Sequence, residues 1–444
     1  MNEPANSPTD SSTAPPRGVW SGTLLQVLGR IWSASCTLVT FALLADWLAP
    51  EAFGRFTFYL AVFAWLDSLA NLGTGQVAVQ RTANDPHAIH SVLAAGRRIR
   101  VLAGLLGVTL VGGWALLEGE PGAVWILLAS FYPVTHALEL SAVVFRNRIS
   151  WRVPVLMRSA ASTLSLAFVL ALRFAGAREP ALYVLGVAAG STIANVLLYF
   201  AARRALPPRV GPPEPADNFF RDALPLGLAA LCSQLYFYVD NVFVRVFVGE
   251  AELGHYNVAV RFLSLLIMIV QYVTLAALPW LTRCHAEGRL AEALAALGPK
   301  VFASAGAVAG LIWPWTFELL ELFHEGTGAA SASFRWLLGA VVAIYAGSLL
   351  VTCVVAAGAN RSMLAISGFA LALNVGANFW AVPRFGIAGA GFTTFLTEST
   401  VAIGGAIVLH RAGVRFLANA PWLWLGGPVA FAAAAGLSSL VRLA

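Results

Sequence analysis

The stretch from Phe219 to Arg283 decides the fold class. It reads FFRDALPLGLAALCSQLYFYVDNVFVRVFVGEAELGHYNVAVRFLSLLIMIVQYVTLAALPWLTR. Two apolar runs of membrane-spanning length flank a short polar turn around residues 249–254, which predicts a transmembrane helical hairpin. Asp240, Arg245 and Arg261 nevertheless lie well inside these runs. Because a charge at the centre of a membrane helix costs about 2.5–3.5 kcal/mol, they indicate either an internal ion pair or a pathway for a polar substrate.

The whole chain has the composition of an all-α polytopic membrane protein. Of its 444 residues, 59% are hydrophobic and 11% are charged, whereas soluble domains have about 25% charged residues. The net charge of +6 does not indicate a nucleic-acid partner, because no soluble domain is predicted that could hold a basic patch. The four cysteines lie in or at the end of apolar runs, without the spacing of a metal site or a disulfide framework.

We count thirteen apolar runs long enough to cross a membrane, which requires about 20 mostly apolar residues. The runs cover residues 22–48, 56–79, 98–117, 122–145, 153–173, 181–202, 219–247, 255–280, 300–322, 335–357, 362–382, 387–409 and 420–441. Arginines and lysines gather at alternate turns, and glutamates gather at the other turns. By the positive-inside rule, this alternation places the N-terminus in the cytoplasm.

The runs divide the chain into two halves of six spans. Residues 1–20 are rich in Pro, Ser and Thr and predict a disordered cytoplasmic tail. We expect one lobe over 21–202, a proline-rich cytoplasmic linker over 203–218, a second lobe over 219–411 and an additional helix within 412–444. The turn at 51–56 resembles 251–256, and the segment 189–192 resembles 390–393. Because each half has an even number of spans, the repeat is parallel, with a central cavity between the lobes.

Soluble catalytic signatures are absent from the sequence, including a P-loop, HExxH and GxSxG. We therefore expect no enzyme activity and no cofactor, and any energy would come from an ion gradient or a partner. The ionisable residues inside the spans are then the candidate functional residues. Arg30 lies roughly 12 Å inside the first run at 1.5 Å per residue. It either grips an anion such as phosphate or extends its side chain to the membrane interface.

In the hairpin, Asp240 and Arg261 lie at similar distances on either side of the turn. Their similar depth predicts an ion pair between them. Arg245 has no acid at a matching depth, so we expect it to face the central cavity. Tyr256 is expected at the membrane interface, where tyrosine is enriched.

The remaining candidates are acids and one histidine. Asp67 either contributes to a cation site or is hydrogen-bonded to Asn71, one helical turn away. His136 and Glu139 share a helix face and either relay protons or have a structural role. Glu398 lies among serines and threonines, which either bind Na⁺ or H⁺ with it or form interhelical hydrogen bonds.

Several segments, in their order and spacing, resemble the Wzx-type flippases, a family of polysaccharide transporters. They are 48–56, 71–81, 224–228, 238–240, 254–262 and 383–390. The resemblance implies the two-lobe, V-shaped, MATE-like fold of the multidrug/oligosaccharidyl-lipid/polysaccharide exporter (MOP) superfamily. Its members usually have twelve or fourteen spans, so the count of thirteen leaves the position of the C-terminus open. Asn71 stands where the family often has an acid, which weakens an ion site at that position.

The resemblance also implies a function. A flippase of this family would carry polyprenyl-diphosphate-linked oligosaccharide across the bacterial inner membrane by alternating access, for O-antigen, capsule or exopolysaccharide synthesis. Its partners would be this lipid, membrane lipids, and the polymerase and glycosyltransferases of the pathway. The candidates for binding the diphosphate or anionic sugars are Arg30, Arg245 and Arg261. The candidates for binding a coupling ion, Na⁺ or H⁺, are Asp67, Asp240 and Glu398.

Two other functions fit parts of the sequence. A drug/cation antiporter of the same fold should have acids rather than arginines in its cavity, and the three arginines within the spans argue against it. A membrane-embedded glycosyltransferase or polymerase usually has its catalytic groups in sizeable external loops, and the outer turns of this chain are short.

Overall fold

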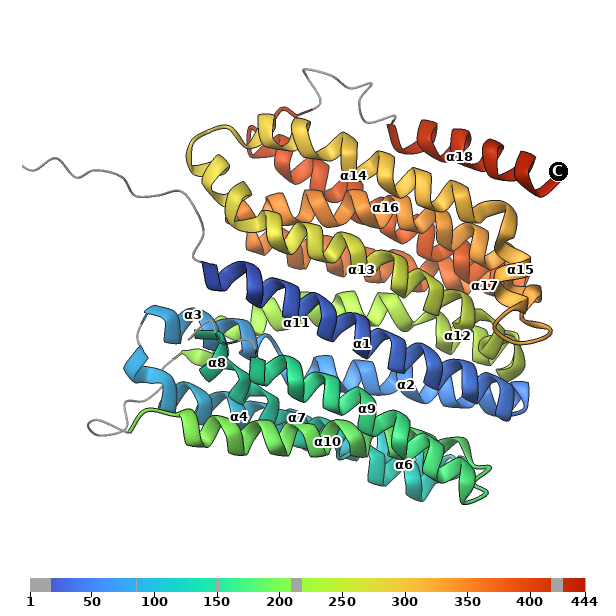
Figure 1. The fold of residues 1–444 in the computed structure, drawn as a ribbon, viewed down its shortest axis with the longest axis horizontal. Coiled ribbons are helices and arrows are strands. Elements are labelled where there is room, and N and C mark those ends of the chain that lie inside the picture. Colours follow the sequence, from blue (N-terminus) through green and yellow to red (C-terminus); the bar gives the residue numbers. More distant parts are fainter. Residues whose placement is uncertain are drawn as a thin grey trace, which may run out of the picture.

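The computed structural model describes residues 17–84, 86–147, 150, 152–208, 218–416 and 426–443. All regular structure in these residues is helical (Figure 1). Residues 1–16 of the expected disordered tail and residues 209–217 of the expected linker lie outside this part of the chain. Residues 17–20 were also expected in the tail, but they begin the first helix.

The first half of the chain forms α1 (Arg17–Trp47), α2 (Pro50–Asn71), α3 (Thr74–Asn84), η1 (Pro86–Ala88), α4 (Ile89–Gly107), η2 (Val108–Gly112), α5 (Gly113–Leu117), α6 (Ala123–Ala129), α7 (Tyr132–His136), η3 (Ala137–Ala142), α8 (Val143–Asn147), α9 (Arg152–Phe174) and α10 (Pro180–Ala205). The second half forms α11 (Phe219–Tyr238), α12 (Asp240–Phe247), α13 (Glu250–Ala286), α14 (Leu290–Ile312), η4 (Trp313–Trp315), α15 (Thr316–Glu321), η5 (Thr327–Ala330), α16 (Ser331–Ala356), α17 (Asn360–Arg411) and α18 (Gly426–Leu443).

Within the described residues, 10 helical stretches are long and apolar enough to cross a membrane. Three features reconcile this number with the thirteen predicted runs. The run at 219–247 is divided between α11 and α12. The runs at 362–382 and 387–409 are continuous in α17, which bends at Gly386, where φ is 57° and glycine adopts the conformation without steric cost. Of the last run, residues 420–425 lie outside the described part, and α18 accounts for the rest.

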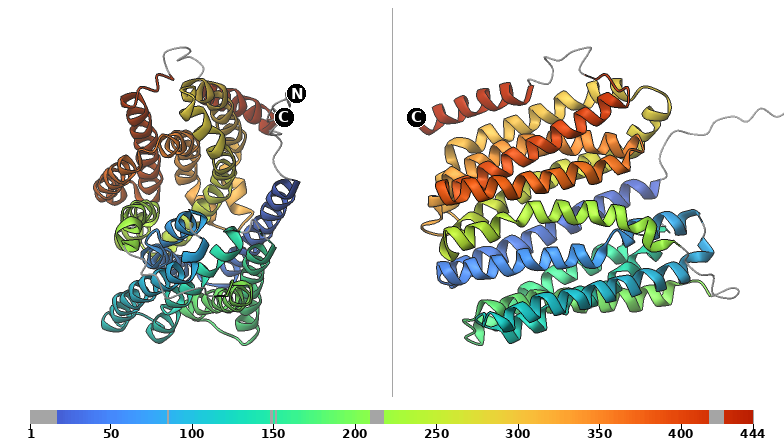
Figure 2. Two further views of the ribbon diagram at one scale, coloured as in Figure 1. Left: turned by 90° about the vertical axis from the view of Figure 1, so that its left-hand side faces the viewer. Right: turned by 180° about the vertical axis from the view of Figure 1, so that it is seen from behind.

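The helices form two groups that lie on opposite sides of the molecule (Figures 1 and 2). Helices α1 to α10 make one group, and α11 to α17 make the other. The helices of both groups run along the same direction, so the bundle has two ends. We call the end where α1 begins the N-terminal face, and the end where α1 finishes and α2 begins the far face. The predicted all-α, two-lobe membrane fold is therefore confirmed.

Helix α18 lies outside the two groups and packs along α14 (Figure 1). The close contact requires glycine, because a Cβ added to Gly306 would lie 1.9 Å from the backbone oxygen of Gly427. At the far face, the Trp315 indole donates a hydrogen bond of 2.8 Å to Ser438, and Arg442 forms an ion pair with Glu318. The described part of the chain therefore ends on the face opposite to the start of α1.

We predict that Gly306→Leu separates α18 from α14, because the new side chain would meet backbone atoms that cannot move alone. Overpacking of this kind costs about 1–3 kcal/mol, which should appear as a lower melting temperature of the purified protein in detergent. The matched control is Gly436→Leu on α18, since a Cβ at Gly436 meets no atom within 4 Å. Equal melting temperatures for the two variants would contradict the prediction.

Candidate functional site

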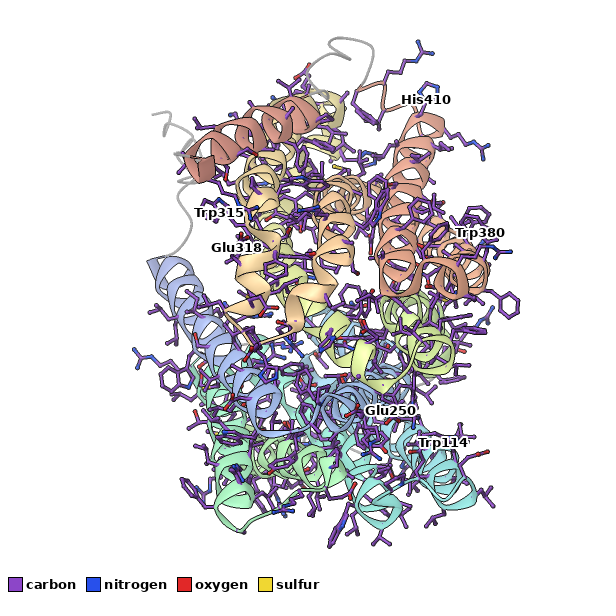
Figure 3. The ribbon with its side chains drawn as sticks, turned by 90° about the vertical axis from the view of Figure 1, so that its right-hand side faces the viewer. Trp114, Glu250, Trp315, Glu318, Trp380 and His410 are labelled. Carbon is purple, nitrogen blue, oxygen red and sulfur yellow. The ribbon has the colours of Figure 1, made fainter. Side chains whose placement is uncertain are left out.

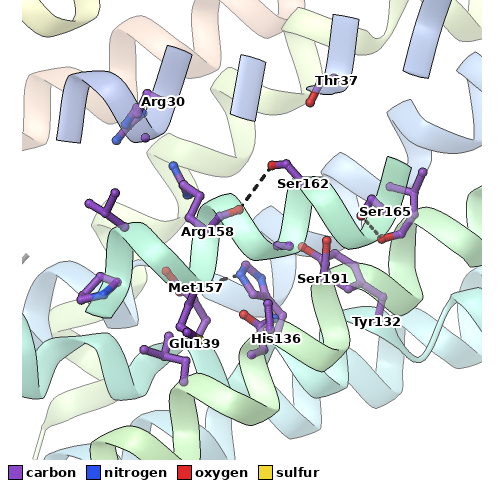
Figure 4. A pocket seen from close by; sticks show the side chains of 18 of the residues that line it. Arg30, Thr37, Tyr132, His136, Glu139, Met157, Arg158, Ser162, Ser165 and Ser191 are labelled. Carbon is purple, nitrogen blue, oxygen red and sulfur yellow. Dashed lines mark hydrogen bonds and ion pairs between the residues drawn. The ribbon is translucent and has the colours of Figure 1, made fainter. Parts of the chain in front are cut away.

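A cavity of about 460 Å³ lies among α1, α7, α9 and α10 of the first half of the chain and also reaches α13 of the second half (Figure 4). Its lining is rich in arginine, whereas Glu139 is the carboxylate among its described lining residues. The arginines come from four helices and are Arg30, Arg146, Arg158 and Arg261. Arg158 extends from α9 toward α1, where Arg30 lies (Figure 4). We call this space the arginine cavity.

Three of these arginines have no carboxylate partner among the described residues. They are Arg30, Arg158 and Arg261. Arg30 instead lies over the ring of Tyr272 at 5.1 Å, and Arg261 lies over Phe41 at 3.7 Å. The Nε atom of Arg261 is buried without a hydrogen-bond partner. Because unpaired guanidinium groups are costly inside a membrane, this cavity suits an anionic ligand.

The predicted ion pair between Asp240 and Arg261 is wrong. One carboxylate oxygen of Asp240 accepts hydrogen bonds from Tyr256 at 2.5 Å and Thr394 at 3.1 Å. Equal depth did not imply contact, because Tyr256 and Arg261 are five residues apart and so point about 140° from one another around α13. Tyr256 is fully buried, so its expected place at the membrane interface is also corrected.

Arg245 does not line the arginine cavity, contrary to expectation. It lies near the far face, where it pairs with Glu120 at 2.7 Å and with Glu250 at 3.1 Å. Its guanidinium group also lies over the ring of Phe58 at 4.4 Å. Glu120 belongs to the first half of the chain, so it is not found when only residues of the hairpin are compared.

The acids of the first half form a network around Arg100, which lies near the start of the predicted run 98–117. Arg100 is 2% exposed and donates to Asn71 at 2.6 Å and to Glu139 at 3.2 Å. Asp67 is paired with His136, whose other ring nitrogen lies 3.8 Å from Glu139. Asp67 thus contacts His136, whereas Asn71 contacts Arg100. The network gives these acids partners and holds Glu139 at the cavity wall.

Arg146 and Arg158 were not among the predicted candidates, because Arg146 directly follows the run 122–145 and Arg158 lies near the start of the run 153–173. Arg146 is 3.6 Å from Glu139 and its side chain is 40% exposed. Arg158 lies six positions inside α9, which is more than one helical turn. Its position within the run was the signal that could have identified it.

A second cavity, with a volume of about 480 Å³, lies among α11, α13, α16 and α17 in the second half. Arg30 lines both cavities, so the two spaces meet at this residue. Glu398 lines the second cavity and is 7% exposed. No hydrogen bond or ion pair joins Glu398 to another described residue. Glu398 is therefore a buried residue whose carboxyl group is available to a ligand at the cavity wall.

The two halves are held together at the far face by a cluster of five residues, which we call the far-face clasp: Arg55, Tyr59, Glu120, Arg245 and Glu250. Two ion pairs cross between the halves, Arg245–Glu120 at 2.7 Å and Arg55–Glu250 at 3.3 Å. Tyr59 also donates a hydrogen bond of 3.1 Å to Glu120. Figure 3 views this face, with Glu250 lying between the two groups of helices.

Beside the clasp, α2 and α13 cross at a pair of glycines. A Cβ at Gly54 would lie 1.7 Å from the backbone oxygen of Glu250, and a Cβ at Gly254 would lie 3.3 Å from the backbone nitrogen of Gly54. The two glycines occupy the same position in the repeated turns 51–56 and 251–256. The repeat therefore supplies the contact by which the two halves approach one another.

We predict that Gly54→Leu pushes α2 and α13 apart at the far face. Because the obstacle is the α13 backbone, the cost of about 1–3 kcal/mol should reduce the population of the closed far face by about fivefold to more than a hundredfold. Pulsed EPR distances between spin labels at Glu51 and Glu252, with the native cysteines replaced, would measure the change. In the control Gly113→Leu, whose Cβ meets no atom within 4 Å, the distance should be unchanged. An unaltered distance in Gly54→Leu would contradict this role.

Comparison with solved structures identifies the fold. An inward-facing multidrug resistance MATE family transporter of the MOP superfamily has a TM-score of 0.69 and 16% identity, over 87% of this chain and 96% of that chain. A MATE transporter in the straight conformation has a TM-score of 0.67 and 16% identity, over 90% and 96% of the two chains. A MOP superfamily transporter from Pyrococcus furiosus, whose binding pocket of reverse polarity suggests a different function, has a TM-score of 0.63 and 16% identity, over 90% and 94%.

No curated protein matches the chain. Residues 19–285, more than half of its length, match the family model of the polysaccharide biosynthesis proteins. This match confirms the expected resemblance to Wzx-type flippases, and the solved structures confirm the MOP superfamily fold. The chain is thus a multi-pass membrane protein that belongs to the polysaccharide biosynthesis protein family.

Proposed function

We propose that this protein is a flippase, which moves a polyprenyl-diphosphate-linked oligosaccharide across the bacterial inner membrane by alternating access. The observation that carries the proposal is the arginine cavity, in which Arg30, Arg158 and Arg261 have no carboxylate partner among the described residues. A diphosphate supplies the negative charge that these groups require. Arginine also binds phosphate oxygens through two parallel hydrogen bonds.

The arrangement of the cavity supports transport rather than static binding. Its cationic lining includes Arg30 in the first part of α1 and Arg158 near the start of α9, both toward the N-terminal face. The opposite end is closed by the far-face clasp. By the positive-inside rule, we assign the N-terminal face to the cytoplasm. The cavity would then receive the lipid-linked sugar from the cytoplasmic side, with the periplasmic side shut.

A drug/cation antiporter is the second candidate, and the multidrug transporters of the same fold favour it. The charges of the arginine cavity argue for an anionic substrate instead, because like charges repel a cation at short range. We further propose that the protein transports the assembled lipid without changing its covalent bonds, and that the polymerase and glycosyltransferases of the pathway act before and after it.

For the coupling ion we propose Asp240. The residue is 2% exposed; its Oδ2 accepts two hydroxyl hydrogen bonds, while Oδ1 is buried without a partner in the described part of the chain. A bound H⁺ or Na⁺ would satisfy the second oxygen, since buried polar atoms without partners are costly. Asp67, Glu139 and His136 already have partners in the network around Arg100.

We predict that Arg158→Ala and Arg30→Ala each weaken binding of polyprenyl diphosphate to the purified protein. A hydrogen bond to a charged group contributes about 1.5–3 kcal/mol, so the loss should be roughly ten- to hundredfold. Cells with either variant should accumulate lipid-linked oligosaccharide in the cytoplasmic leaflet and make less surface polysaccharide. The control is Arg384→Ala, since Arg384 contacts Trp380 at the protein surface and lines neither cavity. Normal export with both cavity variants would contradict the proposal.

We also predict that Asp240→Asn slows flipping at least tenfold and removes its dependence on an ion gradient, because the amide cannot bind a proton or sodium ion as a carboxylate does. Flipping of fluorescent lipid-linked sugar in proteoliposomes, with an imposed H⁺ or Na⁺ gradient, measures both effects. Asp46→Asn is the control, since the Asp46 side chain is 71% exposed. If flipping by Asp240→Asn still depended on the ion gradient, the coupling ion would bind at another residue.

A further inference from the structure

The second cavity differs from the arginine cavity in its chemistry. Apart from Arg30, which the two share, its described lining has no basic residue, and Glu398 is its acid. The polar groups that remain are hydroxyls and amides, which both donate and accept hydrogen bonds. They include Ser233, Ser367, Gln271 and Tyr236. Such a surface matches the hydroxyl groups of a sugar better than it matches a phosphate.

The two cavities can be occupied by one ligand. Arg30 belongs to both linings, so a group bound to Arg30 from the arginine cavity lies at the entrance to the second cavity. The second cavity has a volume of about 480 Å³. This is within the range of about 300–1,000 Å³ that is typical of small-molecule sites. In a lipid-linked sugar, the first monosaccharide is joined directly to the diphosphate. The positions of the two cavities thus correspond to the order of groups in such a molecule.

The Glu398 side chain influences which chemical groups can bind in the second cavity. The residue is 7% exposed, and its carboxyl group has no hydrogen-bond donor among the described residues, although a buried charge without partners is costly. An occupant that supplies hydrogen-bond donors or a positive charge would therefore stabilise the ionised form of Glu398. Neutral sugars provide hydroxyl donors, and amino sugars provide N–H donors. A uronic acid at this position would instead place a second carboxyl group beside Glu398, and two carboxyl groups in close contact cannot both ionise without cost.

We infer that the second cavity binds the sugar nearest to the diphosphate, and that Glu398 makes this subsite select neutral or amino sugars over uronic acids. The inference rests on the proposed function, because it requires a lipid diphosphate in the arginine cavity. It adds a specificity-determining residue and a class of sugar to that function. Ser233 and Ser367, which share a hydrogen bond of 3.2 Å across α11 and α17, line the same subsite.

The test uses the full-length protein in lipid nanodiscs and three probes. These are polyprenyl diphosphate, the same lipid with N-acetylglucosamine, and the same lipid with glucuronic acid. The wild type should bind the N-acetylglucosamine lipid at least tenfold more tightly than the glucuronic acid lipid. In Glu398→Gln, which keeps the shape of the side chain, this preference should fall to less than threefold while binding of polyprenyl diphosphate is unchanged. Gln271→Ala provides a second, milder variant, in which binding of the N-acetylglucosamine lipid alone should weaken.

The binding results distinguish failure of the proposed function from failure of the sugar subsite. If the wild type binds none of the three probes, the proposed function fails. If it binds polyprenyl diphosphate but does not discriminate between the two sugars, only the sugar subsite is overturned. A third result, in which Glu398→Gln abolishes sodium binding by the lipid-free protein and leaves sugar preference intact, would make Glu398 a cation site and overturn the inference. Glu252→Gln at the far face, outside both cavities, should behave as the wild type in every measurement.

Discussion

The structure depends on how each charge inside the membrane is neutralised. Some charged residues have partners within the protein: Arg100 with Glu139, and Arg245 with Glu120 and Glu250. These pairs reduce the cost of burying each charge, and they also fix the helices that contribute the partners. Arg30, Arg158 and Arg261 have no such partner among the described residues. The cost of burying a charge thus explains why some arginines are paired with carboxylates. It also distinguishes these structural arginines from those that are available to a ligand.

The repeat explains why the two halves can meet at one face. Gly54 and Gly254 occupy equivalent positions, and an even number of spans in each repeat places both on the same side of the bundle. Their missing side chains allow α2 and α13 to approach within backbone contact. Around this crossing, the clasp relies on ion pairs at a partly exposed site, which can be exchanged for water at modest cost. A contact of this kind suits a face that must open and close.

The sequence alone predicted the helical runs, the charge alternation and the repeat, because each depends on composition and spacing along the chain. It did not predict which side chains meet. The pair Asp240–Arg261 failed because depth in the membrane leaves the direction around a helix undetermined. Glu120 was missed as the partner of Arg245, since it lies 125 positions away in the other half. Arg146 and Arg158 were missed because the ends of an apolar run do not reveal which residues face a cavity.

A transporter must also release its substrate, and the position of Glu139 bears on this requirement. A site of unpaired arginines alone would bind a diphosphate strongly, whereas passage requires binding that is weak enough to reverse. Glu139 lies at the cavity wall, 3.6 Å from Arg146 and held by Arg100 at 3.2 Å. Under the proposed function, Glu139 would compete with a bound phosphate for Arg146 and would recover this partner when the phosphate leaves. The buried Arg100 network, which binds no substrate in this scheme, would keep that competing carboxylate in place throughout the cycle.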